Sequence, residues 1–122
     1  MNEFKLNKIE KENYNKLDTS FRKDLNIIKF HKSNTEFHEL AKAKICYWLL
    51  KNDKKFCTEA RLTNGSRPDI FNLTDGVAIE VIHSEIQKSI DLKKTKYGIY
   101  ILAVDAMEIL GTEFEDLCNI LN

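Results

Sequence analysis

Arg67-Pro68-Asp69-Ile70 and, after a short turn, Val77-Ala78-Ile79-Glu80-Val81 are the stretches that decide the fold. Each places one carboxylate among residues that favour β-strands. Residues 63–66 and 74–76 carry the Asn, Asp and Gly residues typical of tight turns. The turns delimit three strand-length runs, 55–62, 67–73 and 77–83, which we expect to form an antiparallel meander.

The two carboxylates suggest a binding site for a cation. A carboxylate in a half-buried strand is unfavourable unless a positive group pairs with it. Two neighbouring carboxylates favour a divalent ion such as Mg²⁺, because the ion takes oxygen ligands and its charge offsets their repulsion. Whether Asp69 and Glu80 share a face depends on strand register, which the pattern leaves open. The alternative is that both are edge charges that discourage aggregation.

Helices and one further strand are expected around the meander. Ser33 and Glu36 form a capping-box sequence that predicts a helix to about residue 52. Its spacing predicts an inward face made of Phe37, Leu40, Ala41, Lys44, Ile45, Trp48 and Leu49. Ser84 caps a second expected helix that runs to about residue 97. The apolar run 98–104 predicts a strand covered on both faces. A last helix is expected over residues 106–121.

The predicted fold class is therefore α/β. Its order is helix, three strands, helix, strand and C-terminal helix around a mixed central sheet, with a right-handed crossover before the last strand. Residues 31–122 are expected to form this domain. Residues 1–30, rich in Lys, Asn and Glu, are expected to form an N-terminal arm or loosely attached helical extension, in which 25–30 adds an edge strand or packs on the core.

The order of motifs resembles the PD-(D/E)xK nuclease superfamily, whose name motif corresponds to Pro68-Asp69 and Glu80. More narrowly, the chain is similar to the competence-protein CoiA-like branch, which has a His and a Lys four apart on a helix, then a Glu, an Arg-x-Asp and a second Glu with a Ser beyond. The matching positions over residues 35–104 are His38, Lys42, Glu59, Arg67, Asp69, Glu80 and Ser84. The resemblance implies a restriction-endonuclease-like core and cleavage of phosphodiester bonds.

The resemblance also implies residue roles. Asp69 and Glu80 would hold Mg²⁺ or Mn²⁺, with Glu59 joining them. Contacts to nucleic acid are expected from His38, Arg67, Lys93 and Lys94. The implied partner is nucleic acid, with DNA favoured over RNA, and a homodimer would let so small an enzyme reach both strands of a duplex.

Ile82 departs from the family pattern, because the superfamily has a lysine, and the branch a glutamine, two residues after the second acid. An aliphatic side chain cannot stabilise charge that develops on a phosphate. Either a displaced cation, Lys42 or Lys88, performs this task, or the site is disabled. The leading function is a Mg²⁺-dependent endonuclease, and the alternative is an inactive nuclease-fold module that binds nucleic acid or a protein.

Several candidate residues also have ordinary structural interpretations. Glu59 is expected either to be solvated or to form a salt bridge with Arg61 or Arg67. His38 and Lys42 fit a solvated helix face, and Lys93 and Lys94 fit the wet side of a helix.

Composition excludes several classes of protein. With 122 residues, 43% hydrophobic and 31% charged, the chain fits one globular domain. No apolar run approaches the roughly 20 residues of a membrane span, and residues 1–11 are too charged for a secretory signal, so we expect a cytoplasmic protein. The three cysteines lack metal-ligand spacing, and Cys46 is expected in the core. Net charge is zero, but residues 1–56 hold 13 Lys or Arg against 8 Asp or Glu and can follow a phosphate backbone.

Overall fold

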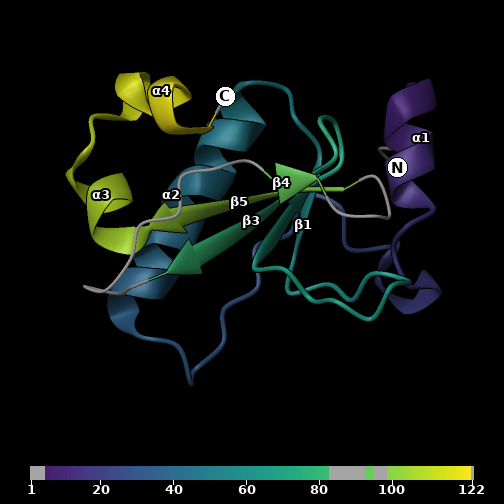
Figure 1. The fold of residues 1–122 in the computed structure, drawn as a ribbon, viewed down its shortest axis with the longest axis horizontal. Coiled ribbons are helices and arrows are strands. Elements are labelled where there is room, and N and C mark those ends of the chain that lie inside the picture. The colour runs from purple at the N-terminus through teal and green to yellow at the C-terminus, as the bar shows by residue number, and fades with distance from the viewer. Residues whose placement is uncertain (1–4, 83–92, 95–98, 122) are drawn as a thin grey trace.

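The computed structural model describes residues 5–82, 93–94 and 99–121. The described helices are α1 (Lys8–Tyr14), α2 (Glu36–Lys51), α3 (Ala106–Gly111) and α4 (Cys118–Leu121), with 3-10 turns η1 (Thr19–Phe21) and η2 (Phe114–Asp116). The described strands are β1 (Phe56–Thr58), β2 (Ile70–Asn72), β3 (Val77–Ile82), β4 (Lys93–Lys94) and β5 (Tyr100–Asp105). Figure 1 shows α2 and α3 at one end of the molecule and α1 at the other.

The strands form one mixed sheet in the order β1-β2-β3-β5-β4. The pairs β1–β2 and β2–β3 are antiparallel, which confirms the predicted meander, and β5 lies parallel to β3. The two-residue β4 is antiparallel to β5 at the edge of the sheet. The chain is thus an α/β protein, as predicted. The handedness of the crossover stays a prediction, because most of the connection lies outside the described residues.

Two predicted helices differ from the structure. The helix expected over 84–97 is wrong for Lys93–Lys94, which form β4, and its other residues lie outside the described part of the chain. The helix expected over 106–121 is interrupted after Gly111, where Thr112 adopts an extended backbone. Lys44 Nζ donates to Ile109 O at 2.8 Å, so a lysine of α2 satisfies the carbonyl end of α3.

Helix α2 has its N-cap two residues later than predicted, and its buried face keeps Ala41, Ile45, Trp48 and Leu49 of the predicted face but is rotated from it. Its N-cap is Thr35, whose hydroxyl accepts from the His38 backbone, and not Ser33. Phe37 and Leu40, expected inside, are exposed. The lysine that points inward is Lys42. The buried residues are Ala41, Lys42, Ile45, Cys46, Trp48 and Leu49.

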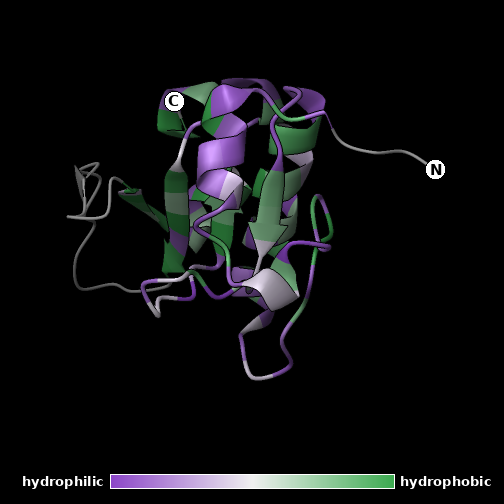
Figure 2. Cartoon of the chain, turned by 90° about the vertical axis from the view of Figure 1, so that its right-hand side faces the viewer, coloured by the Kyte–Doolittle hydropathy of each residue, from purple (hydrophilic) through white to green (hydrophobic). Residues whose placement is uncertain are grey.

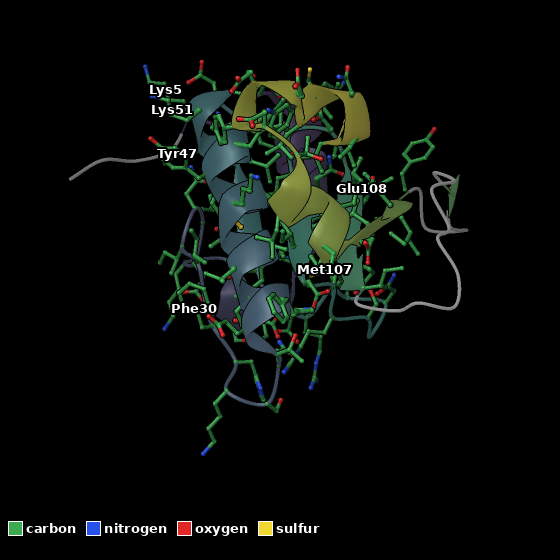
Figure 3. All side chains as sticks on the ribbon, turned by 90° about the vertical axis from the view of Figure 1, so that its left-hand side faces the viewer. Lys5, Phe30, Tyr47, Lys51, Met107 and Glu108 are labelled. Carbon is green, nitrogen blue, oxygen red and sulfur yellow. The ribbon has the colours of Figure 1, made fainter. Side chains whose placement is uncertain are left out.

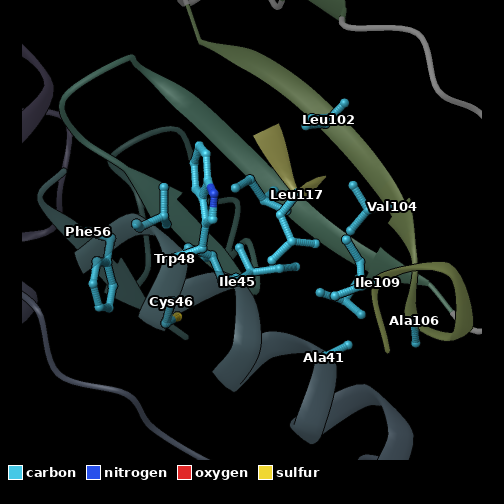
Figure 4. Packing of buried hydrophobic residues seen from close by; sticks show 14 residues of the cluster. Ala41, Ile45, Cys46, Trp48, Phe56, Leu102, Val104, Ala106, Ile109 and Leu117 are labelled. Atoms are coloured by element: carbon cyan, nitrogen blue, oxygen red, sulfur yellow. The ribbon is translucent and has the colours of Figure 1, made fainter. Parts of the chain in front are cut away.

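The main core lies between α2, α3 and one face of the sheet. Ile45 and Trp48 of α2 meet Leu102 and Val104 of β5 in this core, together with Ile109 of α3 (Figure 4). The strands are largely hydrophobic, as Figure 2 shows. Cys46 is fully buried here, as predicted. Among the described residues, no helix has the length and apolar character needed to cross a bilayer.

The N-terminal segment covers a second core and is not a loosely attached arm. Leu17 is fully buried with Leu62 and Phe71, and Tyr14, Phe21 and Leu25 pack against this cluster. Asn13, also buried, donates to Leu73 O at 2.7 Å. Sparse apolar residues misled the prediction, because three or four well-placed side chains suffice to attach a segment to a sheet.

Residues 26–29 complete this packing along the outer edge of β1. Asn26 N donates to Phe56 O at 2.7 Å, and Asn26 Oδ1 accepts from Phe56 N at 2.9 Å. Lys29 N donates to Thr58 Oγ1 at 2.7 Å. The segment therefore satisfies an edge that would otherwise present unpaired backbone groups.

We predict that Leu17→Ala lowers the free energy of unfolding by about 2–5 kcal/mol, the usual cost of a buried Leu→Ala change. Ile9→Ala, on exposed α1 surface, is the matched control and should change it little. Urea denaturation measures both. Equal, small effects would mean that the N-terminal segment is not part of the folded unit.

Candidate functional site

Three carboxylates lie in one row beside the ends of β1, β2 and β3. Ile70 pairs with Thr58 on one side and with Ile79 on the other. One residue beyond these pairs, Glu59 N donates to Asp69 O at 3.2 Å. Glu59 and Asp69 lie outside the strands, and the left-handed backbone of Glu59 interrupts the strand alternation. The hydrogen bond from Val81 N to Asp69 Oδ2 brings Asp69 next to Glu80, a contact that the sequence left open.

Asp69 and Glu80 are in direct contact. Asp69 Oδ2 accepts from Val81 N at 2.8 Å, which brings the Asp69 carboxylate next to Glu80, the residue before Val81. Burial, the Asp69 charge and the more distant Glu59 charge raise the pKa of Glu80 to about 7. Among the described residues, no Lys, Arg or His forms an ion pair with Glu80. Glu80 therefore keeps a proton in conditions where an ordinary glutamate has lost it.

The first half of α2 supplies the basic side chains of the site. His38 Nε2 lies 3.2 Å from Asp69 Oδ2, and His38 Nδ1 lies 2.9 Å from Glu39 Oε1. Lys42 Nζ lies 3.0 Å from Glu39 Oε2 and 3.4 Å from Glu59 Oε2. The four-residue spacing of His38 and Lys42 sets both on the inward side of α2. The expectation of a solvated helix face is therefore wrong for both residues.

Lys42 is the most deeply buried charged group of the site, with 0% of its side chain exposed. The Phe30 ring covers its ammonium group at 5.7 Å. Glu59, which was expected to be solvated or paired with Arg61 or Arg67, instead pairs with Lys42. A buried ammonium is tolerated because two carboxylates and an aromatic face replace its water.

Glu39 joins the two halves of the site, and the sequence analysis missed it. Besides His38 and Lys42, it accepts from Asn34 Nδ2 at 2.9 Å and from His31 N at 3.0 Å. Burial alone would raise the pKa of Glu39, but these hydrogen bonds together outweigh it and lower the pKa to about 2. The i,i+3 spacing of Glu39 and Lys42 was the only sequence feature that could have indicated this role.

The remaining predicted residues lie apart or outside the described chain. Arg67 stacks over the Phe21 ring at 5.8 Å. Lys93 and Lys94 form the edge strand β4, and Lys88 lies outside the described residues. Ile82 pairs with Asp105 at the end of β3 and is partly buried.

The donor set fits Mg²⁺ through two carboxylates. Within the described residues, no three His, Cys, Asp or Glu side chains converge on one metal position, and Glu59 is engaged by Lys42. Mg²⁺ commonly takes one or two protein carboxylates and completes its shell with water and phosphate oxygens. The Asp69–Glu80 pair satisfies this requirement, since burial and the Asp69 charge both disfavour ionised Glu80 and a bound cation would offset both.

Comparison with models of protein families, with curated proteins and with solved structures gave no match to this chain.

We predict that Glu39→Gln lowers the free energy of unfolding by about 2–4 kcal/mol, because it removes one of the two charges that compensate buried Lys42. The folded-state pKa of Glu39 is depressed, so its contribution is full above pH 4.5 and is lost as pH falls toward 2. Denaturant melts between pH 2.5 and 7 measure this, with exposed Glu36→Gln as control. If the free energy of unfolding falls equally steeply toward acid pH in wild type and in Glu39→Gln, the prediction is wrong.

Glu80→Gln should have the opposite effect. Because the folded-state pKa of Glu80 is raised, the folded protein binds more protons than the unfolded chain, and stability falls as pH rises from 4.5 through 7. The amide stays neutral throughout. At pH 8 without metal we expect Glu80→Gln to be more stable than wild type by on the order of 1 kcal/mol, after allowance for solvent screening, and nearly equal at pH 4.5. Exposed Glu12→Gln is the control. If the difference in free energy of unfolding between wild type and Glu80→Gln does not change with pH, the raised pKa of Glu80 is refuted.

Proposed function

We propose that this chain is a Mg²⁺-dependent nuclease with a restriction-endonuclease-like core, which hydrolyses phosphodiester bonds in DNA or RNA. The observation that carries the proposal is the pair of opposed carboxylates, Asp69 and Glu80, of which Glu80 has no cationic partner among the described residues. The resemblance of the sequence to the PD-(D/E)xK pattern supports the same conclusion, because its acids are these two.

Asp69 and Glu80 would hold the ion, and a bound Mg²⁺ would supply charge neutralisation and Lewis acidity at the phosphate. His38 holds Asp69 in place through the 3.2 Å contact, and Val81 N fixes the same oxygen. Mn²⁺ fits the same oxygen donors.

Lys42 supports the site indirectly. Its ammonium is buried and already occupied by Glu39 and Glu59, so it acts by fixing the position of Glu59 at the end of the carboxylate row. Glu59 has a left-handed backbone (φ 52°), an uncommon and strained conformation for a residue with a Cβ atom. Strain of this kind is often concentrated at functional sites, which favours an active role for Glu59.

A non-catalytic module that binds nucleic acid or a protein is the second candidate. Ile82 favours it, because no described lysine takes the place of the motif lysine with a free ammonium, and Lys42 is fully paired. This module would keep the fold and lack cleavage.

The test combines metal binding with cleavage. With Mn²⁺ or Mg²⁺ near 100 times its Kd, wild type should melt about 5–10 °C higher than in EDTA, and Asp69→Asn should lose this shift. Asp75→Asn, an exposed acid at the other end of the same hairpin, is the control and should keep it. For each variant the melting temperature with metal is compared with that of the same variant in EDTA, so a change in its basal stability does not affect the result.

Cleavage of single-stranded, duplex and branched DNA and RNA then separates the two candidates. An enzyme should lose on the order of a hundredfold or more in rate with Asp69→Asn. If wild type binds metal but cuts nothing, Ile82→Lys tests for a disabled site by restoring the family residue. No metal shift and no cleavage by either protein would remove the nuclease proposal.

A further inference from the structure

Phe30 is an exposed aromatic side chain at the border of the candidate site. It is 64% exposed, the most exposed of the large hydrophobic residues that the structure describes. Its ring also lies 5.7 Å from the buried Lys42 ammonium, which in turn contacts Glu59. Figure 3 places Phe30 beside the first turns of α2, far along the helix from Tyr47. One side of the ring covers the Lys42 ammonium, and the rest of its surface is open to solvent and available to a ligand.

The backbone on both sides of Phe30 is fixed by hydrogen bonds. Lys29 N donates to Thr58 Oγ1 at 2.7 Å, and His31 N donates to Glu39 Oε2 at 3.0 Å. The first bond ties the segment to β1 and the second ties it to α2. The backbone that carries Phe30 is therefore fixed beside the candidate site, which lowers the conformational cost of a contact made there.

Two cations lie close in the sequence to Phe30 and Asp69, and one of them, Lys29, is ion-paired with Asp24. Lys29 Nζ and the Arg67 guanidinium both stack over the Phe21 ring, at 5.2 and 5.8 Å from its centroid. Lys29 directly precedes Phe30, and Arg67 lies two residues before Asp69. Aromatic faces beside cations form the usual surface for an unpaired nucleic-acid strand, because bases stack and phosphates pair with the charges.

We infer that Phe30 stacks against an unpaired base next to the bond that is cut, so that the substrate is single-stranded or locally unpaired nucleic acid. This inference rests on the proposed nuclease function. A fully paired duplex cannot present a free base face to the ring, whereas a single strand or a flap can. Arg67 would follow the backbone of the same strand.

Binding to a dye-labelled single strand of about 12 nucleotides tests the inference, with a fully paired duplex of the same sequence for comparison. Ca²⁺ replaces Mg²⁺, and gels confirm that the strands stay intact. We expect Phe30→Ala to bind the single strand roughly 10- to 100-fold more weakly and Phe30→Trp to retain binding. The duplex affinity should not change. Tyr47→Ala, an exposed aromatic at the other end of α2, is the matched control and should bind as wild type does.

A series of single strands, each with one abasic residue at a different position, identifies the stacked base. At one position the abasic residue should weaken binding to wild type and leave Phe30→Ala unaffected, because the contact is already lost. Unchanged single-strand binding by Phe30→Ala, or equal losses on both substrates, overturns the inference. If wild type still cuts nucleic acid in that case, the nuclease proposal stands without it. If wild type neither binds nor cuts any strand, both fall, and a protein partner becomes the occupant of this surface.

Discussion

The ammonium group of Lys42 is completely buried, and a charge at that depth must be compensated by opposite charge or the fold loses several kcal/mol. Glu39 and Glu59 provide this compensation from a helix and from the end of a strand. Glu39 also holds the chain before α2 through His31 and Asn34. Most of the site therefore depends on one requirement, which is the neutralisation of a lysine that α2 points inward.

The site forms where the inward side of α2 changes character. Its second half presents Ile45 and Leu49 to the sheet and builds a dry core. One turn before Ile45, the same side presents Lys42, and one turn before that it presents His38. Lys42 contacts Glu59 after the end of β1, and His38 contacts Asp69 before the start of β2. A helix that is apolar at one end and ionic at the other fixes a polar cluster against a rigid scaffold. Among the described residues, every buried side-chain nitrogen and oxygen has a hydrogen-bond partner.

Two glutamates of this cluster experience opposite environments. Glu39 accepts hydrogen bonds from several donors, and its pKa falls to about 2. Glu80 faces Asp69, and its pKa rises to about 7. Burial acts on both in the same direction, so the difference comes from their partners. The arrangement leaves the Asp69–Glu80 pair without a lysine or arginine partner among the described residues and a fully ion-paired cluster behind it, which separates a candidate ligand position from its support.

The sequence by itself determined the elements whose causes are local. Turn residues fixed the meander, alternation fixed which residues of a strand share a side, and the apolar run 98–104 predicted strand β5. The expected cover on both faces of β5 is wrong, because burial alternates along the strand and Ile101 is 37% exposed. The residue types of the site, His38, Lys42, Glu59, Asp69 and Glu80, were also recognisable from their order along the chain.

Only the tertiary structure decided how these pieces meet. A contact beyond the last paired residues of β2 brought Asp69 next to Glu80, and the sequence could not fix it because alternation within a strand does not say which residues meet between strands. The rotation of α2 buries Lys42 in the site, whereas Lys44 donates to a carbonyl at the end of α3. Glu39 and Phe30 gained their positions through contacts with residues far away in the chain, and the N-terminal segment was attached by Leu17. Such contacts depend on which surfaces the folded elements bring together, and no local pattern records them.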